Sequence, residues 1–388
     1  MGSLGIGGAE RSLISILSNI DYDKYSVDLM LFNPNGEFKK LLPKEVNILH
    51  PDEDYILFDL NPIKSIKKFF LKLKWKYMFF NMLYLIKLTF NRFILNKEYI
   101  GWEIRRRMLN KIEGNYDLAI GFLEKKCTYY TVDKIVANKK IGWVHTDYNS
   151  IEYDYKLEKK YLGKLNKIIA VSNNCKKTLQ VLFPMYKDKI DVIENIVSPE
   201  LINKQADQYI SEDLFNKKEN EITIVTVARL APPKGLDIAI EACKKIKDKG
   251  FKIRWYVIGE GNERENLIEK INILKLKNTF LLLGNRVNPY PYIKLCDIYV
   301  QPSKWEGFGI TVLEAKILNK PIVATNIPEF REQINNNVNG LLFDDIDTLV
   351  KSIITIIENK NLANKFIENL KSINFDNSNE INKLLKLI

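Results

Sequence analysis

Two glutamates at the ends of one short motif carry the most specific chemical signal in the sequence. The run EGFGITVLE occupies residues 306–314, with a glycine-bearing turn after its first residue. We expect Glu306 in a loop and Glu314 just over one turn into the following helix, with both carboxylates on one side. Carboxylates accept hydrogen bonds from hydroxyl groups, and a helix N-terminus attracts phosphate. The spacing therefore predicts a site for a phosphate flanked by hydroxyl-bearing groups. A surface position for Glu314 is the alternative, which the Gly-Phe-Gly turn disfavours.

Two basic residues in the run VARLAPPKG, residues 227–235, supply a partner for that phosphate. Arg229 and Lys234 follow an apolar strand and precede the start of a helix. Cations that leave a strand end in this way can converge on a diphosphate. If this motif stood alone, two solvated cations on a loop would explain it equally well.

A glycine-rich turn near the N-terminus is a third candidate for phosphate binding. The run GIGGAER, residues 5–11, leads into the helical pattern of residues 12–19. Without side chains, Gly7 and Gly8 let the backbone approach a phosphate that the helix N-terminus then binds. The turn lacks the acidic residue that completes the dinucleotide-binding fingerprint. On its own it is weak evidence, because many such turns bind nothing.

Residues that commonly bind metals are few and scattered. The chain has two histidines, His50 and His145, which excludes an HExxH site. Its four cysteines form no CxxC pair, which indicates a reducing cytoplasm and argues against disulfides and a thiolate zinc site. Asp-x-Asp pairs occur only in polar, turn-like stretches, so we expect them to be solvated and the site to work without a metal. These pairs are Asp21/Asp23, Asp52/Asp54 and Asp345/Asp347.

Short β-branched runs that alternate with longer amphipathic stretches must position these motifs. The alternation is typical of α/β proteins with parallel sheets, and 388 residues suffice for two or three domains. We expect an N-terminal domain over 1–198, a linker over 199–221, a second domain over 222–372 and a terminal helix over 373–388. The predicted strands are 27–32, 46–49, 118–122, 141–144, 168–171, 223–227, 255–258, 279–283, 298–301, 322–324 and 340–343.

Positive charge is concentrated between residues 61 and 111, here called the basic segment. It holds 13 lysines and arginines against two glutamates, while the whole chain has a formal net charge of +11. Apolar residues recur at helical spacing from Ile66 to Tyr84, with Trp75 and Met78 on a second face. Two interpretations stay open: a surface helix of the first domain, or a helix that binds an anionic membrane surface. No nucleic-acid-binding motif accompanies the segment, and no apolar stretch is long enough to cross a bilayer.

Together the motifs resemble glycosyltransferase family four, a large family of retaining enzymes with the GT-B fold. The resemblance runs from about Ser3 to the C-terminus and implies two Rossmann-like domains that face each other across a cleft. Family members normally have a hydrophobic strand before the glycine turn. Here Met1–Leu4 leaves no room for it, so we expect this strand to be missing and the true start to lie upstream. The motifs are GGAER at 7–11, ARLAPPKG at 228–235, IGEG at 258–261, QPSKWEGFGITVLEA at 301–315, ATNIPEF at 324–330 and NGLLF at 339–343.

The resemblance assigns roles to individual residues. Glu306 contacts the donor sugar and Glu314 binds the ribose hydroxyls, while Arg229 and Lys234 neutralise the leaving diphosphate. His145 matches a cleft histidine near the donor sugar. A satisfied buried side chain is the alternative for a lone histidine, but its position at a strand end favours function. The other donor-binding positions are Gly7 and Gly8 over the phosphates, Asn285, Arg286 and Val287 at the nucleobase, and the amides of Phe308, Gly309 and Ile310.

The implied function is the transfer, with retention, of a hexose-type sugar from a nucleotide sugar to a glycan or lipid-linked glycan. Family frequency favours UDP, and we expect neither a metal nor a cofactor, because the nucleotide sugar is a substrate. The implied location is cytoplasmic, or peripheral on the inner face of the plasma membrane. A nucleotide-sugar epimerase or glycoside phosphorylase on the same fold is one rival. A non-catalytic subunit of a polysaccharide assembly complex is another, although it would not need the four charged motif residues.

Overall fold

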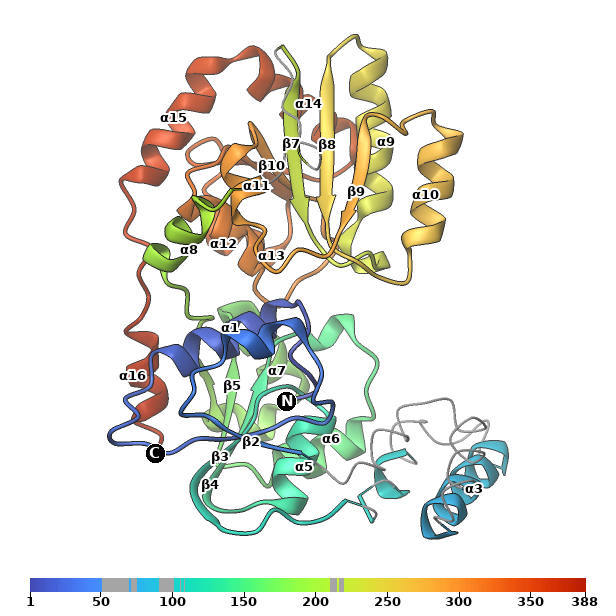
Figure 1. The fold of residues 1–388 in the computed structure, drawn as a ribbon, viewed down its shortest axis with the longest axis vertical. Coiled ribbons are helices and arrows are strands. Elements are labelled where there is room, and N and C mark those ends of the chain that lie inside the picture. Colours follow the sequence, from blue (N-terminus) through green and yellow to red (C-terminus); the bar gives the residue numbers. More distant parts are fainter. Residues whose placement is uncertain are drawn as a thin grey trace. The chain divides into compact units, whose positions relative to one another are not determined.

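The computed structural model describes residues 1–50, 70, 75–90, 101–104, 106–107, 109–209, 215 and 220–388. The chain forms two compact units, each an α/β structure (Figure 1). The first unit contains Met1–Gly5, Ala9–Glu194 and Asn379–Ile388, and the second contains Ile6–Gly8 and Asn195–Ser378. No helix in these ranges is long and apolar enough to span a membrane.

The second unit is built on a six-stranded sheet in which every neighbouring pair is parallel. Its strand order is β12-β11-β10-β7-β8-β9, so the order reverses between β7 and β10. In open parallel sheets, ligands bind beyond the carboxyl ends of the strands at such a reversal. The strands are β7 Ile222–Val227, β8 Ile253–Ile258, β9 Phe280–Gly284, β10 Ile298–Gln301, β11 Ile322–Thr325 and β12 Leu341–Phe343.

Helices cover both faces of this sheet because its strands are apolar on both sides. Ile224 and Trp255 belong to one buried cluster, and their neighbours Val225 and Tyr256 belong to another. Such alternation follows from the two-residue period of a strand. Helices α9, α10, α14 and α15 contribute to the first cluster, and α8, α11, α12 and α13 to the second. Their bounds are α8 Pro199–Ala206, α9 Leu236–Asp248, α10 Arg264–Ile273, α11 Tyr290–Leu295, α12 Ile310–Ile317, α13 Pro328–Gln333, α14 Ile346–Glu358 and α15 Lys360–Lys371.

The segment 199–221, expected to be a linker, is in part a structural element of the second unit. Its first residues form α8, with Ser198 accepting a hydrogen bond from the Leu201 amide as the N-cap. Ile202 and Ala206, one turn apart, are buried in the second cluster. A polar composition with two apolar residues at helical spacing thus conceals a short packed helix.

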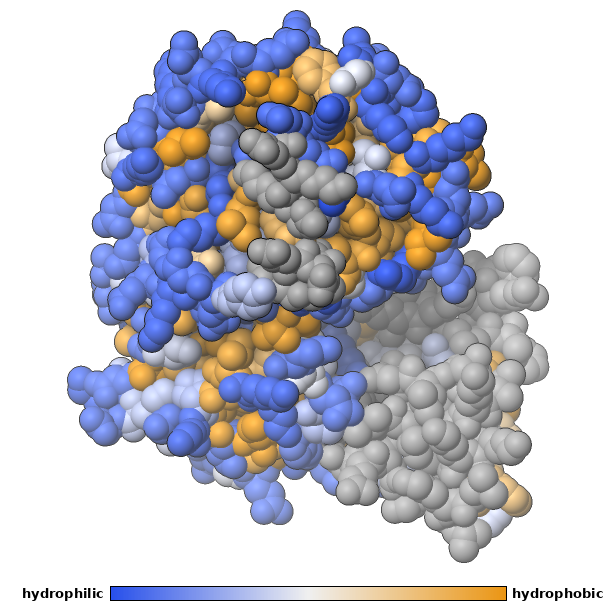
Figure 2. Space-filling view, turned by 45° about the horizontal axis from the view of Figure 1, so that its top comes forward, coloured by the Kyte–Doolittle hydropathy of each residue, from blue (hydrophilic) through white to orange (hydrophobic). Residues whose placement is uncertain are grey.

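On the face shown in Figure 2, hydrophilic side chains cover most of the second unit.

The first unit has two parallel sheets. β1 Asp28–Met30 pairs with β2 Asn47–Leu49, and the other sheet has the order β3-β4-β5-β6. Its last strand was not predicted, because only two of its three residues are apolar. The remaining elements are β3 Asn115–Gly121, β4 Val136–Val144, β5 Lys167–Ala170, β6 Ile190–Val192, α1 Gly8–Ser18, α3 Trp75–Phe90, α5 Lys126–Lys134, α6 Tyr155–Leu162, α7 Asn173–Leu182 and α16 Glu380–Leu385.

Residues 1–4 lie beside the end of β1 although no strand is assigned to them. The carbonyls of Met1 and Gly2 accept hydrogen bonds from the amides of Phe32 and Asn33, at 3.1 and 2.8 Å. The side chain of Leu4 is fully buried. These contacts satisfy backbone groups that would otherwise lack partners after β1.

The chain returns to the first unit at its C-terminal end. A helix was expected over 373–388, and the structure forms α16 at 380–385 within that range. A carboxylate oxygen of Glu380 accepts a hydrogen bond from the Glu194 amide at 3.1 Å. The Lys139 ammonium donates to the Ile388 carbonyl at 3.1 Å. Residues 373–378, by contrast, group with the second unit.

Candidate functional site

The loops after β7 and β10 meet where the strand order of the second unit reverses. Gly235, which precedes α9, has a left-handed backbone with φ of 62°. A Cβ atom at this position would lie 1.9 Å from the carbonyl oxygen of Pro302 in the loop after β10. The Lys304 amide also donates to the Pro233 carbonyl at 2.8 Å. Only glycine permits this approach, which brings the starts of both loops into contact.

This approach places two of the predicted catalytic residues in direct contact. The ammonium group of Lys234 lies 2.7 Å from Oε1 of Glu306, and the two side chains are 16% and 12% exposed. Arg229 is exposed, and in the described part of the chain its side chain has no hydrogen bond or ion pair. Arg229 and Lys234 both follow β7, so this edge of the sheet carries two cations that can meet a diphosphate.

Glu314 is fully buried, so the surface alternative for this residue is wrong. It is the fifth residue of α12, just over one turn into the helix, where its Oε1 atom accepts a hydrogen bond from the Tyr290 hydroxyl at 3.0 Å. Gly309, with φ of 80°, is the N-cap of this helix. A Cβ atom there would lie 2.4 Å from the ring of Phe330. The second glycine of the motif is therefore required by backbone conformation and by packing.

The other predicted donor-binding residues of the second unit lie in the same set of loops. Phe308 is partly buried and its carbonyl accepts a hydrogen bond from the Gln333 amide, while Ile310 is buried at the first position of α12. Residues 285–287 follow β9. The guanidinium of Arg286 donates to the Asn285 carbonyl at 2.8 Å and to the Tyr292 hydroxyl at 3.2 Å, and Val287 is exposed.

The predicted residues near the N-terminus have less direct support from geometry. Gly8 is the first residue of α1, directly after Gly7, and both group with the second unit. His145 belongs to the first unit, where it follows β4. Its ring centroid lies 4.8 Å from that of Phe122, and burial lowers the pKa of His145 to about 3. His145 is therefore neutral at physiological pH, and in the described part of the chain its buried Nε2 atom has no hydrogen-bond partner.

Sequence reasoning missed several residues that hold the site together. Ser303 donates its hydroxyl proton to Oε1 of Glu306 at 2.7 Å, and Gln301 donates to Ser303 at 2.9 Å. The Tyr290 hydroxyl donates to Glu314 in the same way. In the first unit, Oε2 of Glu124 accepts a hydrogen bond from the His145 amide at 3.0 Å. One signal was visible: Gln301 is a polar residue at the end of an otherwise apolar strand.

The Asp-x-Asp pairs have structural partners where they are described. Asp21 forms an ion pair with Lys24 at 2.7 Å, and Asp345 is the N-cap of α14 in a capping box with Thr348. Asp52 and Asp54 lie outside the described residues. Among the described residues, no group of three or more histidine, cysteine, aspartate or glutamate side chains is placed to hold a metal ion.

Comparison with known proteins finds a family match that is confined to the second unit. Residues 210–372 match the model of the family glycosyl transferases group 1. An uncharacterised glycosyltransferase of Methanocaldococcus jannaschii is 29% identical over 43% of this chain, which spans 41% of that relative's length. A Campylobacter jejuni relative is 25% identical over 95% of this chain and 92% of its own length. Its name is N-acetylgalactosamine-N,N'-diacetylbacillosaminyl-diphospho-undecaprenol 4-alpha-N-acetylgalactosaminyltransferase.

Solved structures confirm the predicted fold class. HepE of Anabaena, in complex with UDP and glucose, matches with a TM-score of 0.69 at 19% identity, over 100% of this chain and 96% of that chain. WaaG, a glycosyltransferase involved in lipopolysaccharide biosynthesis, matches with a TM-score of 0.66 at 12% identity, over 100% and 98%. At these identities the likeness concerns the fold, which is the GT-B fold of glycosyltransferases.

Proposed function

We propose that this protein is a retaining glycosyltransferase, because residues 210–372 match the model of the glycosyl transferases group 1 family. It moves a hexose-type sugar from a nucleotide sugar to a glycan acceptor. The observation that carries the proposal is the contact between Lys234 and Glu306 at the reversal of the strand order. A cation for the diphosphate and a carboxylate for the sugar hydroxyls are adjacent there, as transfer of a glycosyl group requires.

The proposed reaction breaks the bond between the anomeric carbon and the diphosphate oxygen. A bond from the acceptor oxygen to the same face of that carbon replaces it, and the leaving phosphate takes the acceptor proton. Lys234 and Arg229 stabilise the negative charge that develops on the diphosphate, together with the amide groups at the start of α12. Glu306 accepts hydrogen bonds from the sugar hydroxyls, and Glu314 accepts them from the ribose.

The relatives support a choice of donor and acceptor. HepE binds UDP and glucose, and the name of the Campylobacter jejuni relative describes transfer to a diphospho-undecaprenol-linked sugar. We therefore propose a UDP-sugar donor and a lipid-linked glycan acceptor, in the synthesis of a bacterial surface polysaccharide. No metal or other cofactor takes part, since cationic side chains and helix amides already neutralise the diphosphate.

A thermal-shift panel with UDP, GDP, ADP and NAD in the presence of EDTA tests the donor site. We expect UDP to raise the melting temperature by mass action, and the other ligands to do so less. Stabilisation by GDP or ADP instead would change the proposed donor, and no shift with any nucleotide would contradict the site. Conversion of a UDP-sugar to its epimer without an acceptor would favour the epimerase alternative.

An exposed apolar stripe on α3 supports a location at the membrane surface. The stripe consists of four apolar side chains at helical spacing, each between 43% and 55% exposed: Trp75 55%, Phe79 55%, Met82 48% and Ile86 43%. Large apolar side chains gathered in this way mark interaction surfaces. The basic segment to which α3 belongs carries 13 cationic and two acidic residues, so the partner that we propose is an anionic lipid bilayer.

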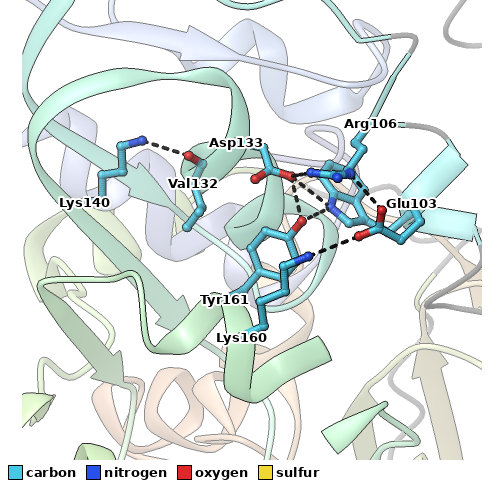
Figure 3. A network of polar contacts seen from close by, with 8 residues as sticks. Glu103, Arg106, Val132, Asp133, Lys140, Lys160 and Tyr161 are labelled. Atoms are coloured by element: carbon cyan, nitrogen blue, oxygen red, sulfur yellow. Dashed lines mark hydrogen bonds and ion pairs between the residues drawn. The ribbon is translucent and has the colours of Figure 1, made fainter. Parts of the chain in front are cut away.

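The inner face of α3 and the end of the basic segment are fixed to the first unit. Tyr77, Phe80 and Tyr84 pack against a buried cluster that includes Trp102. The network in Figure 3 joins the same region to α5 and α6. Arg106 lies 3.4 Å from Asp133 and 3.1 Å from Glu103, and Lys160 lies 3.2 Å from Glu103. The Trp102 indole also donates to the Tyr161 hydroxyl at 2.7 Å. Both interpretations of the helix thus contribute: one face packs, and we propose that the other binds lipid.

A further inference from the structure

A chain of buried polar groups leads from β10 to the Glu306 carboxylate. The Tyr299 hydroxyl donates to Oε1 of Gln301 at 2.8 Å, and the Gln301 amide nitrogen donates to the Ser303 hydroxyl at 2.9 Å. That hydroxyl donates to Oε1 of Glu306 at 2.7 Å. Thr311 adds a second donor to Oε1 of Gln301 at 3.3 Å. Tyr299 and Ser303 are fully buried and Gln301 is 1% exposed, so water does not compete for these bonds.

The hydrogen-bonding groups from Tyr299 to Glu306 permit only one assignment of donors and acceptors. A carboxylate accepts hydrogen bonds, so Ser303 must use its single proton toward Glu306. Its oxygen is then left to accept from the Gln301 amide group. The oxygen of Gln301 consequently faces Tyr299 and Thr311, which both donate. Every buried group has a partner in this arrangement, which is the condition for a buried polar network to be stable.

The chain of bonds acts on one oxygen of the carboxylate. Ser303 and Lys234 each lie 2.7 Å from Oε1 of Glu306. In the described part of the chain, no residue donates a hydrogen bond to Oε2. The carboxylate is therefore held in one orientation through Oε1, and Oε2 is available to accept a hydroxyl proton. Because the Glu306 carboxylate is already ordered before the sugar binds, less entropy is lost when the hydrogen bond to the sugar hydroxyl forms.

We propose that Gln301 and Ser303 are positioning residues for Glu306, which they orient toward a hydroxyl group of the donor sugar. The inference rests on the proposed function, because it needs a sugar at Glu306. A positioning role differs from a packing role in one respect: replacing Gln301 or Ser303 affects catalysis only when the Glu306 carboxylate is present. The two residues therefore act on the sugar half of the donor and leave the recognition of the nucleoside diphosphate to Lys234, Arg229 and Glu314.

The test is a double-mutant cycle between Ser303→Ala and Glu306→Ala. Turnover is measured by UDP release from whichever of UDP-glucose, UDP-galactose and their N-acetyl derivatives the wild type uses, and UDP affinity by calorimetry. We expect Ser303→Ala to lower kcat/KM about 10- to 100-fold through misplacement of the carboxylate, with UDP affinity within about twofold of wild type. In the Glu306→Ala background, the same substitution should have no further effect.

Gln301→Met, which has nearly the same size, provides a second variant should Ser303→Ala fail to fold. Thr226→Val is the matched control, because its hydroxyl is equally buried and donates to the Val300 carbonyl at 2.7 Å, away from Glu306. Ser303→Thr, which keeps the hydroxyl, should restore most of the turnover.

The outcomes separate this inference from the proposed function. Equal losses from Ser303→Ala with and without Glu306, or a parallel fall in UDP affinity, would show a merely structural role. If Glu306→Ala is impaired while Ser303→Ala and Gln301→Met match wild type, the positioning role alone is overturned. If the wild type releases UDP from none of the sugar nucleotides, the proposed function fails and the inference fails with it.

Discussion

The ammonium group of Lys234 and Oε1 of Glu306 are 2.7 Å apart although they come from different loops. Each loop alone gives an ambiguous pattern in the sequence, and the contact arises because β7 and β10 are neighbours in the sheet. Gly235 lets the first loop pass close to Pro302 of the second. In the absence of substrate the two charges neutralise each other. We propose that the diphosphate and the sugar replace this contact when the donor binds.

Removal of either member of this pair should lower turnover strongly, but with different effects on UDP binding. We expect Lys234→Ala to lower kcat by about 10²- to 10³-fold and to weaken UDP binding, because the leaving charge loses its cation. Glu306→Ala should lower turnover to a similar extent with UDP affinity nearly unchanged, because UDP has no sugar. Lys304→Ala is the control, since this exposed lysine in the same loop pairs with Asp237 at 3.2 Å. Near-normal turnover in both pair variants would contradict the site.

His145, whose Nε2 atom is buried, should make the first unit sensitive to acid. The pKa of His145 is lowered to about 3 by burial, compared with an ordinary value of 6.5. Between these values the unfolded chain binds a proton that the folded chain does not, so stability is lost as the pH falls from 6.5 toward 3. The loss approaches about 1.4 kcal/mol per pH unit for one such group. Above pH 6.5 the histidine should have no effect on the pH dependence of stability.

Melting temperatures of the wild type and His145→Phe between pH 4.5 and 7.5 check this prediction. The variant keeps an aromatic ring against Phe122 but cannot titrate, so its melting temperature should fall less on acidification. The exposed His50, changed to glutamine, is the control and should follow the wild type. If the wild type and His145→Phe lose stability in parallel, another group is responsible for the acid sensitivity.

The two-unit fold follows from local sequence patterns more directly than the site does. β10 is a run of apolar and aromatic residues before Gln301, and its strand is visible without a structure. β6 has three residues and one of them is Asp191, so it owes its pairing to β5 rather than to its own composition. The contact of Ser303 with Glu306 depends on how a loop folds back. No periodic pattern of residues indicates this contact, so it could not be predicted from the sequence.

Gly235 should tolerate no side chain. Comparison with Gly250 separates the cost of a left-handed backbone from the cost of a steric clash between a new Cβ atom and its neighbours. A Cβ at Gly235 would lie 1.9 Å from the Pro302 carbonyl oxygen, while Gly250, with φ of 88°, has nothing within 4 Å. We expect Gly250→Ala to cost about 1–2 kcal/mol of stability through its left-handed backbone alone. Gly235→Ala should cost more and should also weaken UDP binding. Equal melting temperatures and UDP affinities for the two variants would show that the approach of the loops is unimportant.

The exposed face of α3 should determine binding to lipid vesicles. We expect the wild type to sediment with vesicles that contain anionic lipid and not with neutral vesicles. Salt should weaken the binding, because salt ions screen the attraction between the basic segment and the lipid. Trp75→Ser combined with Phe79→Ser removes two side chains that are 55% exposed, so it should reduce sedimentation at little cost in stability.

Ile273→Ser is the matched control, because this residue is 69% exposed on α10 of the second unit, outside the basic segment. It should sediment like the wild type. Replacement of the exposed Lys76 by glutamate tests the electrostatic part separately, and it should weaken binding most at low salt. Binding that is equal for neutral and anionic vesicles, or unchanged in the double variant, would contradict a lipid partner. The stripe would then be better explained as a surface for another protein.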